Sequence, residues 1–343
     1  MKIILDAMGG DLAPQAQVEG AVRAVRAYDV EVVLVGREAE ILDVLRDLGH
    51  ASLPMGLSIV NASEVVTMDD DPTNVFREKK DSSLSVGLKL LKDGGGDGFV
   101  SAGNTGALLV GATLIPRRIR GIRRAALTPV IPNREGGALL IDCGANTECV
   151  PEYLVQFAYM GSYYVRRVLG RETPRVGLLS NGTEETKGTP LHKETYQLLQ
   201  EAHALGKLNF IGNIEGRDVL LGGVDVVVTD GFTGNVLLKG IEGTAMFLTG
   251  ELKSIFMQSA TTKLAALLVR KGLRNFKKKM DVSEVGGTAL LGITKPVIKA
   301  HGNSDAKTIS SAIRQARDLA QSGIIEDITT NIGKTSPKHE ENA

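Results

Sequence analysis

Residues 224–239, VDVVVTDGFTGNVLLK, join an almost uninterrupted apolar run to a short polar loop and then to a helical pattern. An apolar run of this kind is typical of a parallel strand that is covered on both faces of its sheet. The loop contains Asp230, Gly231, Gly234 and Asn235. The stretch therefore predicts a strand, a loop at the carboxyl end of that strand, and a helix that begins in the loop.

The same alternation recurs along most of the chain. We expect strands at residues 2–6, 31–35, 57–61, 98–102, 138–143, 175–180, 208–212, 224–229 and 296–300. We expect helices at residues 14–28, 38–48, 84–92, 105–115, 151–169, 190–205, 233–257 and 305–322. Strands that alternate with helices predict an α/β fold with a mainly parallel sheet and helices on both faces. We expect a single domain over residues 1–334, followed by a polar, disordered tail at 335–343.

The composition excludes several classes of protein. The chain has 343 residues, with 40 basic and 40 acidic side chains, so its formal net charge is zero and gives no overall attraction to nucleic acid. Aromatic residues make up 4% and tryptophan is absent, which leaves no stacking platform for single strands. Two cysteines cannot form a disulfide framework or a four-ligand zinc site. With no apolar run of about 18 residues and no signal-peptide pattern, we expect a soluble protein of a reducing compartment.

Glycine is enriched, at 40 of 343 residues, which is about 12% against ~7% in ordinary proteins. It gathers in six small polar loops that follow expected strands, at residues 6–11, 101–107, 142–147, 180–188, 229–235 and 299–305. In an open parallel sheet, ligands bind outside the carboxyl ends of the strands. Glycine lets the backbone approach a ligand, and the following helices present N–H groups and a positive dipole. One such loop is ordinary turn chemistry, but six together predict an anion-binding crevice.

Several familiar motifs are absent from the sequence. Gly9-Gly10 does not extend to a dinucleotide-binding fingerprint, and the 182–188 loop is not a nucleotide-binding P-loop. No serine elbow and no HExxH zinc motif occur. The sequence therefore offers no support for a covalent serine mechanism or for a zinc hydrolase.

The glycine-rich loops also carry a resemblance to a known family. In order along the chain, the resembling segments are DAMGGD (6–11), SAGNTGA (101–107), IDCGAN (141–146), VGLLSNGTEETKG (176–188), VVVTDGFTGNVLLK (226–239) and PVIKAHGNSDA (296–306). Together they resemble the bacterial phosphate acyltransferases of phospholipid synthesis, which depend on acyl carrier protein. Cys143 departs from the aliphatic residue expected at its position.

The resemblance implies a fold, an activity and partners. The fold would be a three-layer α/β/α arrangement around one mixed sheet, similar to phosphotransacetylase and to isocitrate and isopropylmalate dehydrogenases, in a homodimer. The activity would move a long-chain acyl group from acyl carrier protein to inorganic phosphate, without a cofactor or metal. The acyl phosphate would pass to a membrane glycerol-3-phosphate acyltransferase. The protein would then be cytoplasmic and peripherally bound to the inner face of the cell membrane.

Four side chains are the catalytic candidates. Lys187 could bind phosphate or the oxyanion, although a solvated loop lysine is the alternative. The Asn235 amide could donate to the same groups or cap a helix. His301 could protonate the departing thiolate, donate to phosphate, or be a turn residue. Asp230 would orient Lys187 or a helix terminus. For phosphate binding, the candidates are Gly9, Gly10, Asn104, Thr105, Gly182, Thr183 and Gly234.

Two basic patches suggest contact surfaces. Residues 117–124 contain five arginines, among them Arg117, Arg120 and Arg124, which could attract an acidic carrier protein or remain a solvated charge run. Residues 252–280 contain eight basic residues and no acid: Lys253, Lys263, Arg270, Lys271, Arg274, Lys277, Lys278 and Lys279. Apolar residues such as Leu267 and Leu268 recur there near helical spacing, which is typical of a membrane-surface helix. A dimer interface or a carrier-docking site are the alternatives.

Three readings of the function stay open on the sequence. The first is the phosphate acyltransferase. The second is an enzyme of the same fold, either a phosphotransacetylase that acts on coenzyme A thioesters or a dehydrogenase, although no metal-binding aspartate cluster or nucleotide loop is found for the latter. The third is a non-catalytic scaffold at the membrane surface that recruits the carrier protein.

Overall fold

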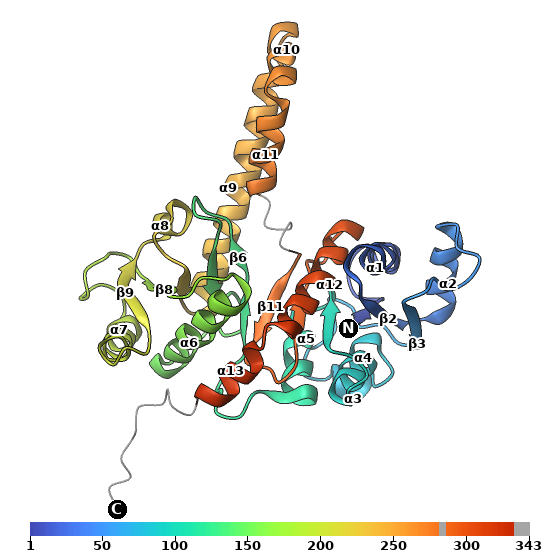
Figure 1. Cartoon of the computed structure of the whole chain (residues 1–343), viewed down its shortest axis with the longest axis horizontal. Helices are drawn as coiled ribbons and strands as arrows, with labels where there is room; N and C mark the ends of the chain where they lie inside the picture. Colours follow the sequence, from blue (N-terminus) through green and yellow to red (C-terminus); the bar gives the residue numbers. More distant parts are fainter. Residues whose placement is uncertain (281–285, 333–343) are drawn as a thin grey trace, which may run out of the picture.

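The computed structural model describes residues 1–280 and 286–332, and it has two sheets flanked by helices (Figure 1). The larger sheet has the order β3-β2-β1-β4-β12-β11-β5. Its strands are β1 (Lys2–Asp6), β2 (Glu31–Gly36), β3 (Leu57–Asn61), β4 (Gly98–Ser101), β5 (Ala126–Thr128), β11 (Thr288–Leu291) and β12 (Val297–Lys299). The first five strands of that order pair in parallel, whereas β11 is antiparallel to both of its neighbours.

The smaller sheet has the order β6-β7-β10-β8-β9. Its strands are β6 (Val130–Ile131), β7 (Ala138–Ile141), β8 (Arg175–Leu179), β9 (Asn209–Ile214) and β10 (Val226–Val228). They pair in parallel except for the short β6 at the edge. The nine expected strands are therefore confirmed within two residues at every end, and the α/β class with a mainly parallel arrangement is confirmed.

The expectation of one mixed sheet was wrong, because the chain divides its strands between two sheets. The division falls at Pro129, which lies between β5 in the larger sheet and β6 in the smaller one. Proline has no N–H to donate to a neighbouring strand, so it interrupts a hydrogen-bonded ladder. The two sheets still touch here, since the backbone N–H of Cys143 donates to Leu127 O over 3.0 Å.

Helices cover both faces of the sheets. Those before β8 are α1 (Gln15–Tyr28), α2 (Glu38–Asp47), α3 (Val75–Glu78), α4 (Ser83–Lys92), α5 (Thr105–Ala112), the π-helical turn η1 (Thr113–Arg117) and α6 (Pro151–Val168). The later ones are α7 (Pro190–Ala204), α8 (Gly216–Leu221), α9 (Gly231–Met257), α10 (Ala260–Leu268), α11 (Arg270–Met280), α12 (Ala306–Gln321) and α13 (Ile324–Asn331).

Strand β1 shows how the layers form. Ile3 and Leu5 point into a core cluster shared with α1 and α12, whereas Ile4 points into a cluster on the other face, shared with α4 and α5. Alternate side chains of a strand lie on opposite faces, so an apolar run such as β1 needs a helix layer on each side. The first cluster also contains residues of the smaller sheet, among them Leu139 and Val228. This cluster therefore spans both sheets.

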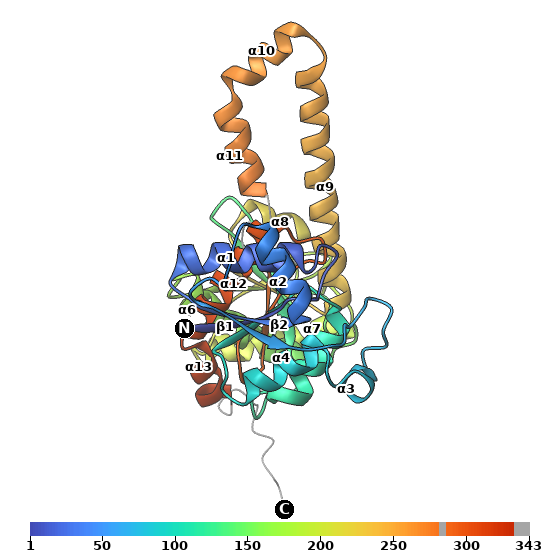
Figure 2. The same cartoon turned by 90° about the vertical axis from the view of Figure 1, so that its right-hand side faces the viewer.

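Helices α9 to α11 project from this body as a hairpin (Figures 1 and 2). Helix α9 runs outward, α10 lies at the tip and α11 returns toward the body. The basic segment expected at 252–280 is thus not one helix but the end of α9 followed by two further helices. The break is local, because Ser259 caps α10 by accepting from the N–H of Thr262. The expected tail at 335–343 lies outside the described residues, as do the side chains of Lys277, Lys278 and Lys279.

Candidate functional site

A cleft of about 790 Å³ lies between helix α9 and the loop that joins β12 to α12. One wall is the inward face of α9, which contributes Leu238, Ile241, Ala245 and Met246. The opposite wall is polar and comes from the end of β12 and from the 299–305 loop. The residues that line this wall are Lys299, His301, Gly302, Asn303, Ser304 and Asp305, together with Asp11 from the loop after β1. Lys239 and Glu242 of α9 also line the cleft, so it sets apolar and charged side chains of one helix against a polar loop.

Glu242 links two basic groups of this cleft. Its carboxylate lies 2.7 Å from Lys239 Nζ on the same helix and 3.7 Å from Nε2 of His301 on the opposite wall. Burial lowers the pKa of His301 below its ordinary value of 6.5, Lys239 and Lys299 lower it further, and Glu242 acts against them. His301 is therefore mainly neutral at pH 7. Of the four catalytic candidates, it is the one that lines this cleft.

Lys299 is a site residue that the sequence reasoning did not single out. It ends β12, and its ammonium donates to the carbonyl oxygens of Ala102 (3.1 Å) and Ala300 (2.5 Å). Burial lowers its pKa to about 8, although Asp6 and Asp11 act in the opposite direction. The available signal was a lysine inside the apolar run PVIKA, because lysine is rarely placed in a buried strand without a partner or a function.

Helix α9 begins where the 229–235 loop was expected to lie. Asp230 caps it, accepting from the N–H (2.9 Å) and the hydroxyl (2.8 Å) of Thr233. Asp230 is thus the N-cap of α9, and Asn235 is not. Asn235 lies one turn further on, exposed, beside Gly144. At Gly234 a Cβ atom would stand 2.1 Å from Asp142 O, so this glycine permits close packing of α9 on the 142–146 loop.

The 180–188 loop holds Lys187 outside the cleft. Lys187 is exposed, its N–H donates to Glu184 O, and its aliphatic stem lies over Gly182. Gly182 is buried beneath that stem, while Thr183 is exposed, and neither lines the cleft. His192, in the first turn of the helix that follows this loop, lies near Asp230 of the 229–235 loop. Burial lowers the pKa of His192, and nearby Asp230 opposes that effect.

His192 braces the loop that carries Lys187. It belongs to the first turn of α7, and its Nδ1 lies 2.8 Å from the hydroxyl of Thr189. A Cβ atom at Gly188 would stand 2.5 Å from the His192 Cβ, so the ring packs directly under the loop. Gly188 has φ +87°, and its N–H donates to the Asn181 side chain over 2.9 Å. These contacts fix the backbone that carries Lys187.

The loops after β1 and β4 pack against each other. A Cβ atom at Gly9 would stand 2.8 Å from the N of Gly103, and Gly10 has φ +112°. Between them, the buried Asp6 accepts from the Ser101 hydroxyl over 2.7 Å. Small residues are needed here because two backbone turns meet. The loop after β1 reaches the cleft at its far end, where the N–H of Asp11 donates to Gly302 O over 2.7 Å.

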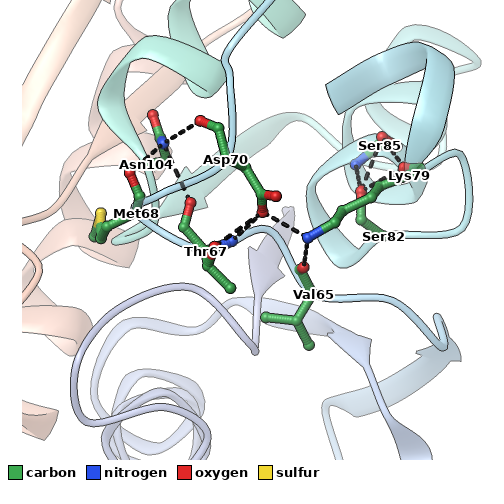
Figure 3. Close-up of polar contacts among 8 residues, drawn as sticks. All are labelled: Val65, Thr67, Met68, Asp70, Lys79, Ser82, Ser85 and Asn104. Carbon is green, nitrogen blue, oxygen red and sulfur yellow. Dashed lines mark hydrogen bonds and ion pairs between the residues drawn. The ribbon is translucent and has the colours of Figure 1, made fainter. Parts of the chain in front are cut away.

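Asn104 is fully engaged by protein atoms (Figure 3). Its Oδ1 accepts from the N–H of Ala107, which caps α5, and its Nδ2 lies 3.2–3.4 Å from the carbonyl oxygens of Thr67, Met68 and Asp70. Lys79 closes the same loop by pairing with Asp70 over 2.6 Å and donating to Val65 O over 2.9 Å. Asn104 thus clamps the 65–70 loop over the start of α5. Thr105 beside it is exposed.

Neither cysteine has the environment of a nucleophile. Burial, then the charge of Asp142, raises the pKa of Cys143 to about 12, and the same two causes raise the pKa of Cys149 to about 12. A thiol with such a pKa carries almost no thiolate near pH 7. Cys143 is buried and Cys149 is half-buried.

Comparisons with known proteins identify the family. A model of the family described as "Fatty acid synthesis protein" matches residues 1–327. A protein of Thermoanaerobacter pseudethanolicus named "Phosphate acyltransferase" is 47% identical over 333 residues, which cover 97% of each chain. One of the same name from Thermoanaerobacterium thermosaccharolyticum is 45% identical over 332 residues, again 97% of each. The chain belongs to the phosphate acyltransferase family.

A solved structure adds a likeness in fold to this family assignment. A phosphotransacetylase from Streptococcus pyogenes superposes with a TM-score of 0.61 at 20% identity, over 93% of this chain and 94% of that one. At this identity the likeness shows the fold alone. The family and the fold inferred from the six loops are thus both confirmed.

The arginine-rich loop of this family member, residues 117–124, displays its charges on the surface. Ile119 and Ile122 are buried, whereas Arg117, Arg120 and Arg124 are exposed. Arg124 lies over the ring of Tyr153 at 5.5 Å from its centroid. The loop packs beside the end of α13, on the opposite side of the body from the α9–α11 hairpin (Figures 1 and 2). The two basic patches are therefore separate surfaces.

The hairpin exposes large apolar side chains at its tip. Leu267 is 62% and Leu268 80% exposed, and no residue of α10 is buried. Arg270 and Lys271 follow at the start of α11 and are exposed as well. Over residues 1–280 and 286–332, no helix is long and apolar enough to cross a membrane.

Proposed function

We propose that this chain transfers a long-chain acyl group from acyl carrier protein to inorganic phosphate, yielding acyl phosphate for phosphatidic acid synthesis. The observation that carries this proposal is the cleft beside α9, which sets an ammonium group and an imidazole opposite the apolar side chains of that helix, among them Leu238, Ile241 and Met246. An anion and an acyl chain need those two environments side by side. The name shared by the relatives and the phosphotransacetylase-like fold support the same reaction class.

The reaction does not need a nucleophilic side chain. An oxygen of hydrogen phosphate forms a bond to the acyl carbon, and the carbon–sulfur bond breaks with its electron pair on sulfur. The proton of hydrogen phosphate ends on the carrier thiol, whose ordinary pKa is about 8.5. The work of the protein is then to bring a dianion and a thioester together and to stabilise the oxyanion with fixed donors. The buried, high-pKa thiols of this chain are in keeping with such a direct attack.

We assign roles to the candidate residues within this scheme. The neutral imidazole of His301 lies in the cleft, where it could relay the proton from phosphate to sulfur. Lys187 and the Asn235 amide would donate to the thioester carbonyl as it becomes an oxyanion. Asp230 supports both by capping α9 and by lying near His192 under the lysine loop.

Each basic surface is assigned one partner. The exposed arginines of the 117–124 loop would attract the acidic carrier protein. The leucines and the cationic residues at the hairpin tip would rest on the inner face of the cell membrane, because anionic lipid attracts each basic residue by ~1 kcal/mol. A cytoplasmic homodimer at that surface could release its hydrophobic product, acyl phosphate, directly to a membrane glycerol-3-phosphate acyltransferase.

A thiol-release assay tests the reaction. Purified protein is mixed with palmitoyl carrier protein and either phosphate or sulfate, which has the same shape but is a poor nucleophile. We expect free carrier thiol with phosphate alone, together with a product that hydroxylamine traps. Release without phosphate would contradict the proposed transfer and indicate a hydrolase instead.

A phosphotransacetylase that acts on coenzyme A thioesters is the second candidate, and the fold of the Streptococcus pyogenes enzyme favours it. The same assay separates the two if palmitoyl-coenzyme A and acetyl-coenzyme A replace the carrier substrate. Faster turnover of either coenzyme A thioester would favour the second candidate. No turnover of any thioester would leave the membrane-surface scaffold.

A further inference from the structure

The end of strand β12 places one ammonium group between the ends of two neighbouring strands. Lys299 Nζ donates to Ala102 O, just after β4, and to Ala300 O, just after β12. β12 and β4 are neighbours in the larger sheet, with Lys299 paired to Ser101. Two of the three ammonium protons are thereby fixed on backbone oxygens at the carboxyl ends of two parallel strands. This is the edge of an open sheet at which ligands bind.

A second polar group on the same wall lacks a partner in the described residues. Ser304 is 4% exposed and lines the cleft, and its hydroxyl has no hydrogen-bond partner within residues 1–280 and 286–332. A buried hydroxyl without a partner costs free energy unless a ligand or water completes it. Helix α12 begins two residues later and is capped by Asp305, and the N-terminus of a helix favours a bound anion.

Charged groups of several elements act on Lys299 or line the same cleft. They are Asp6 of β1, Asp11 of the following loop, Lys239 and Glu242 of α9, and His301 and Asp305 of the 299–305 loop.

Most of the surrounding carboxylates already have partners. Asp6 accepts from Ser101, Glu242 is paired with Lys239, and Asp305 accepts from Thr308 over 2.8 Å. Their charge is thus largely used within the protein, whereas the ammonium of Lys299 meets mainly neutral carbonyl oxygens. A half-buried cation with neutral acceptors and an unpartnered hydroxyl nearby fits a small oxyanion better than it fits a metal ion.

We propose that Lys299, with the Ser304 hydroxyl, binds the attacking phosphate, and that Lys187 serves the acyl donor instead. This assignment rests on the proposed function, because it divides the two substrates of that reaction between two lysines. The phosphate then lies at the polar wall of the cleft, and the acyl chain follows the apolar face of α9.

Binding of the anion should draw a proton to the site. Burial lowers the pKa of Lys299 to about 8, so at pH 8 this amine is about half protonated in the empty protein. A bound dianion favours the charged form and raises that pKa again. The complex therefore takes up as much as about half a proton at pH 8, and binding weakens as the pH rises above 8.

Isothermal titration of the full chain with inorganic phosphate, and separately with sulfate, tests this inference at pH 8. Buffers of different ionisation enthalpy report the protons taken up, and sulfate does not titrate in this range. We expect proton uptake with both anions. In K299M we expect the affinity for both anions to fall about tenfold or more, while K92M, an exposed lysine on α4, binds as the wild type does.

The arginine variant separates charge from structure. Arginine stays protonated at pH 8, so K299R should retain much of the phosphate affinity but lose most of the proton uptake. Its KM for phosphate should also stop rising above pH 8. Unchanged uptake in K299R, or unchanged affinity in a folded K299M, would overturn the inference.

The binding experiment is independent of acyl transfer because no thioester is present. Phosphate binding through Lys299 in a protein that transfers no acyl group would leave this site in place and refute the proposed function alone. Transfer activity with an unaltered KM for phosphate in K299M would support the proposed function and refute the assignment of Lys299 to phosphate.

Discussion

The two sheets of this protein end in loops that place their lysines differently. Lys187, after β8, is exposed, and the contacts around it fix its backbone through Gly188 and His192. Lys299, after β12, is half-buried, and its ammonium itself is fixed on two carbonyl oxygens. A fixed ammonium loses little rotamer entropy when it binds an anion, whereas an exposed lysine side chain loses more. Lys299 is therefore the preorganised cation of the two, because its ammonium is held by hydrogen bonds, whereas glycines surround both lysine loops alike.

The largest effect should come from Asp142, whose side chain connects the larger sheet to the loop that packs against α9. This fully buried carboxylate accepts from the N–H of Leu127 in the larger sheet (2.8 Å) and of Asn146 beside α9 (2.6 Å). D142A leaves buried donors without a partner, and we expect unfolding free energy to fall by about 3–5 kcal/mol. Chemical denaturation at pH 7 measures it. D69A, an exposed carboxylate, should change stability by less than about 0.5 kcal/mol, and equal effects would refute the bridging role.

Next in size is the effect of K187M on turnover. If Lys187 stabilises the oxyanion of the acyl donor, kcat should fall roughly 100–1,000-fold, as for the loss of one oxyanion donor, while KM for phosphate changes little. Steady-state kinetics with palmitoyl carrier protein measure both constants. K193M, an exposed lysine of α7, is the matched control and should be unaffected. A rise in KM for phosphate would break the division between the two lysines.

His301 should contribute a smaller, pH-dependent effect. Its pKa lies below 6.5 because of burial and the nearby lysines, so the neutral imidazole predominates above pH 6.5. Activity that needs this neutral form is present at pH 7 and is lost as the pH falls through the lowered pKa. H301Q should reduce kcat/KM about 100-fold and remove that acid limb, whereas H50Q should not. A profile of kcat/KM between pH 5 and 8 decides, and an unchanged acid limb in H301Q would refute the proton relay.

The hairpin tip should affect location rather than chemistry. In a double variant, L267E/L268E, carboxylates replace the leucines that are 62% and 80% exposed. We expect loss of cosedimentation with phosphatidylglycerol vesicles, with less than about a twofold change in turnover of soluble substrate. L205E, at an exposed leucine of the body, is the control. Vesicle binding that persists, or a dimer that dissociates in gel filtration, would assign the tip to a protein contact.

The smallest effect should come from the cysteines. Because burial raises the pKa of both Cys143 and Cys149 to about 12, neither should react with a disulfide reagent at pH 8 until the protein unfolds. A C143A/C149A variant should keep its turnover within about twofold. Fast labelling of the folded protein, or loss of activity in that variant, would return a thiol to the candidate site.

Much of the fold could be predicted because its strands are apolar and its helices amphipathic. The run at 226–228 and the helix over 231–257 follow directly from those patterns. Strands β5 and β6, of three and two residues, were missed, since so few residues display no period. The antiparallel β11 was also missed. It is followed directly by its neighbour β12 with no helix between them, and a strict alternation of strands and helices does not predict such a connection.

The structure places the expected site residues in different surroundings. His301 lies in the cleft and Asp230 caps a helix as expected, but Lys187 lies outside the cleft and Asn104 is used as a clamp. Lys299 was missed although its segment had been singled out. Glycine and small polar residues mark where a chain turns at the end of a strand, and every such loop looks alike until its neighbours are known.

The sequence alone determined the order of strands and helices, the six glycine-rich loops and the family. Local hydrophobic periodicity indicates the strands and helices, and motifs in a fixed order indicate the loops and the family. The tertiary structure decided which loops share a cleft. β12 inserts beside β4 and brings Lys299 against Ala102, almost 200 residues earlier in the chain. The pairing of distant strands depends on the packing of both faces of a sheet at once, and no local pattern encodes it.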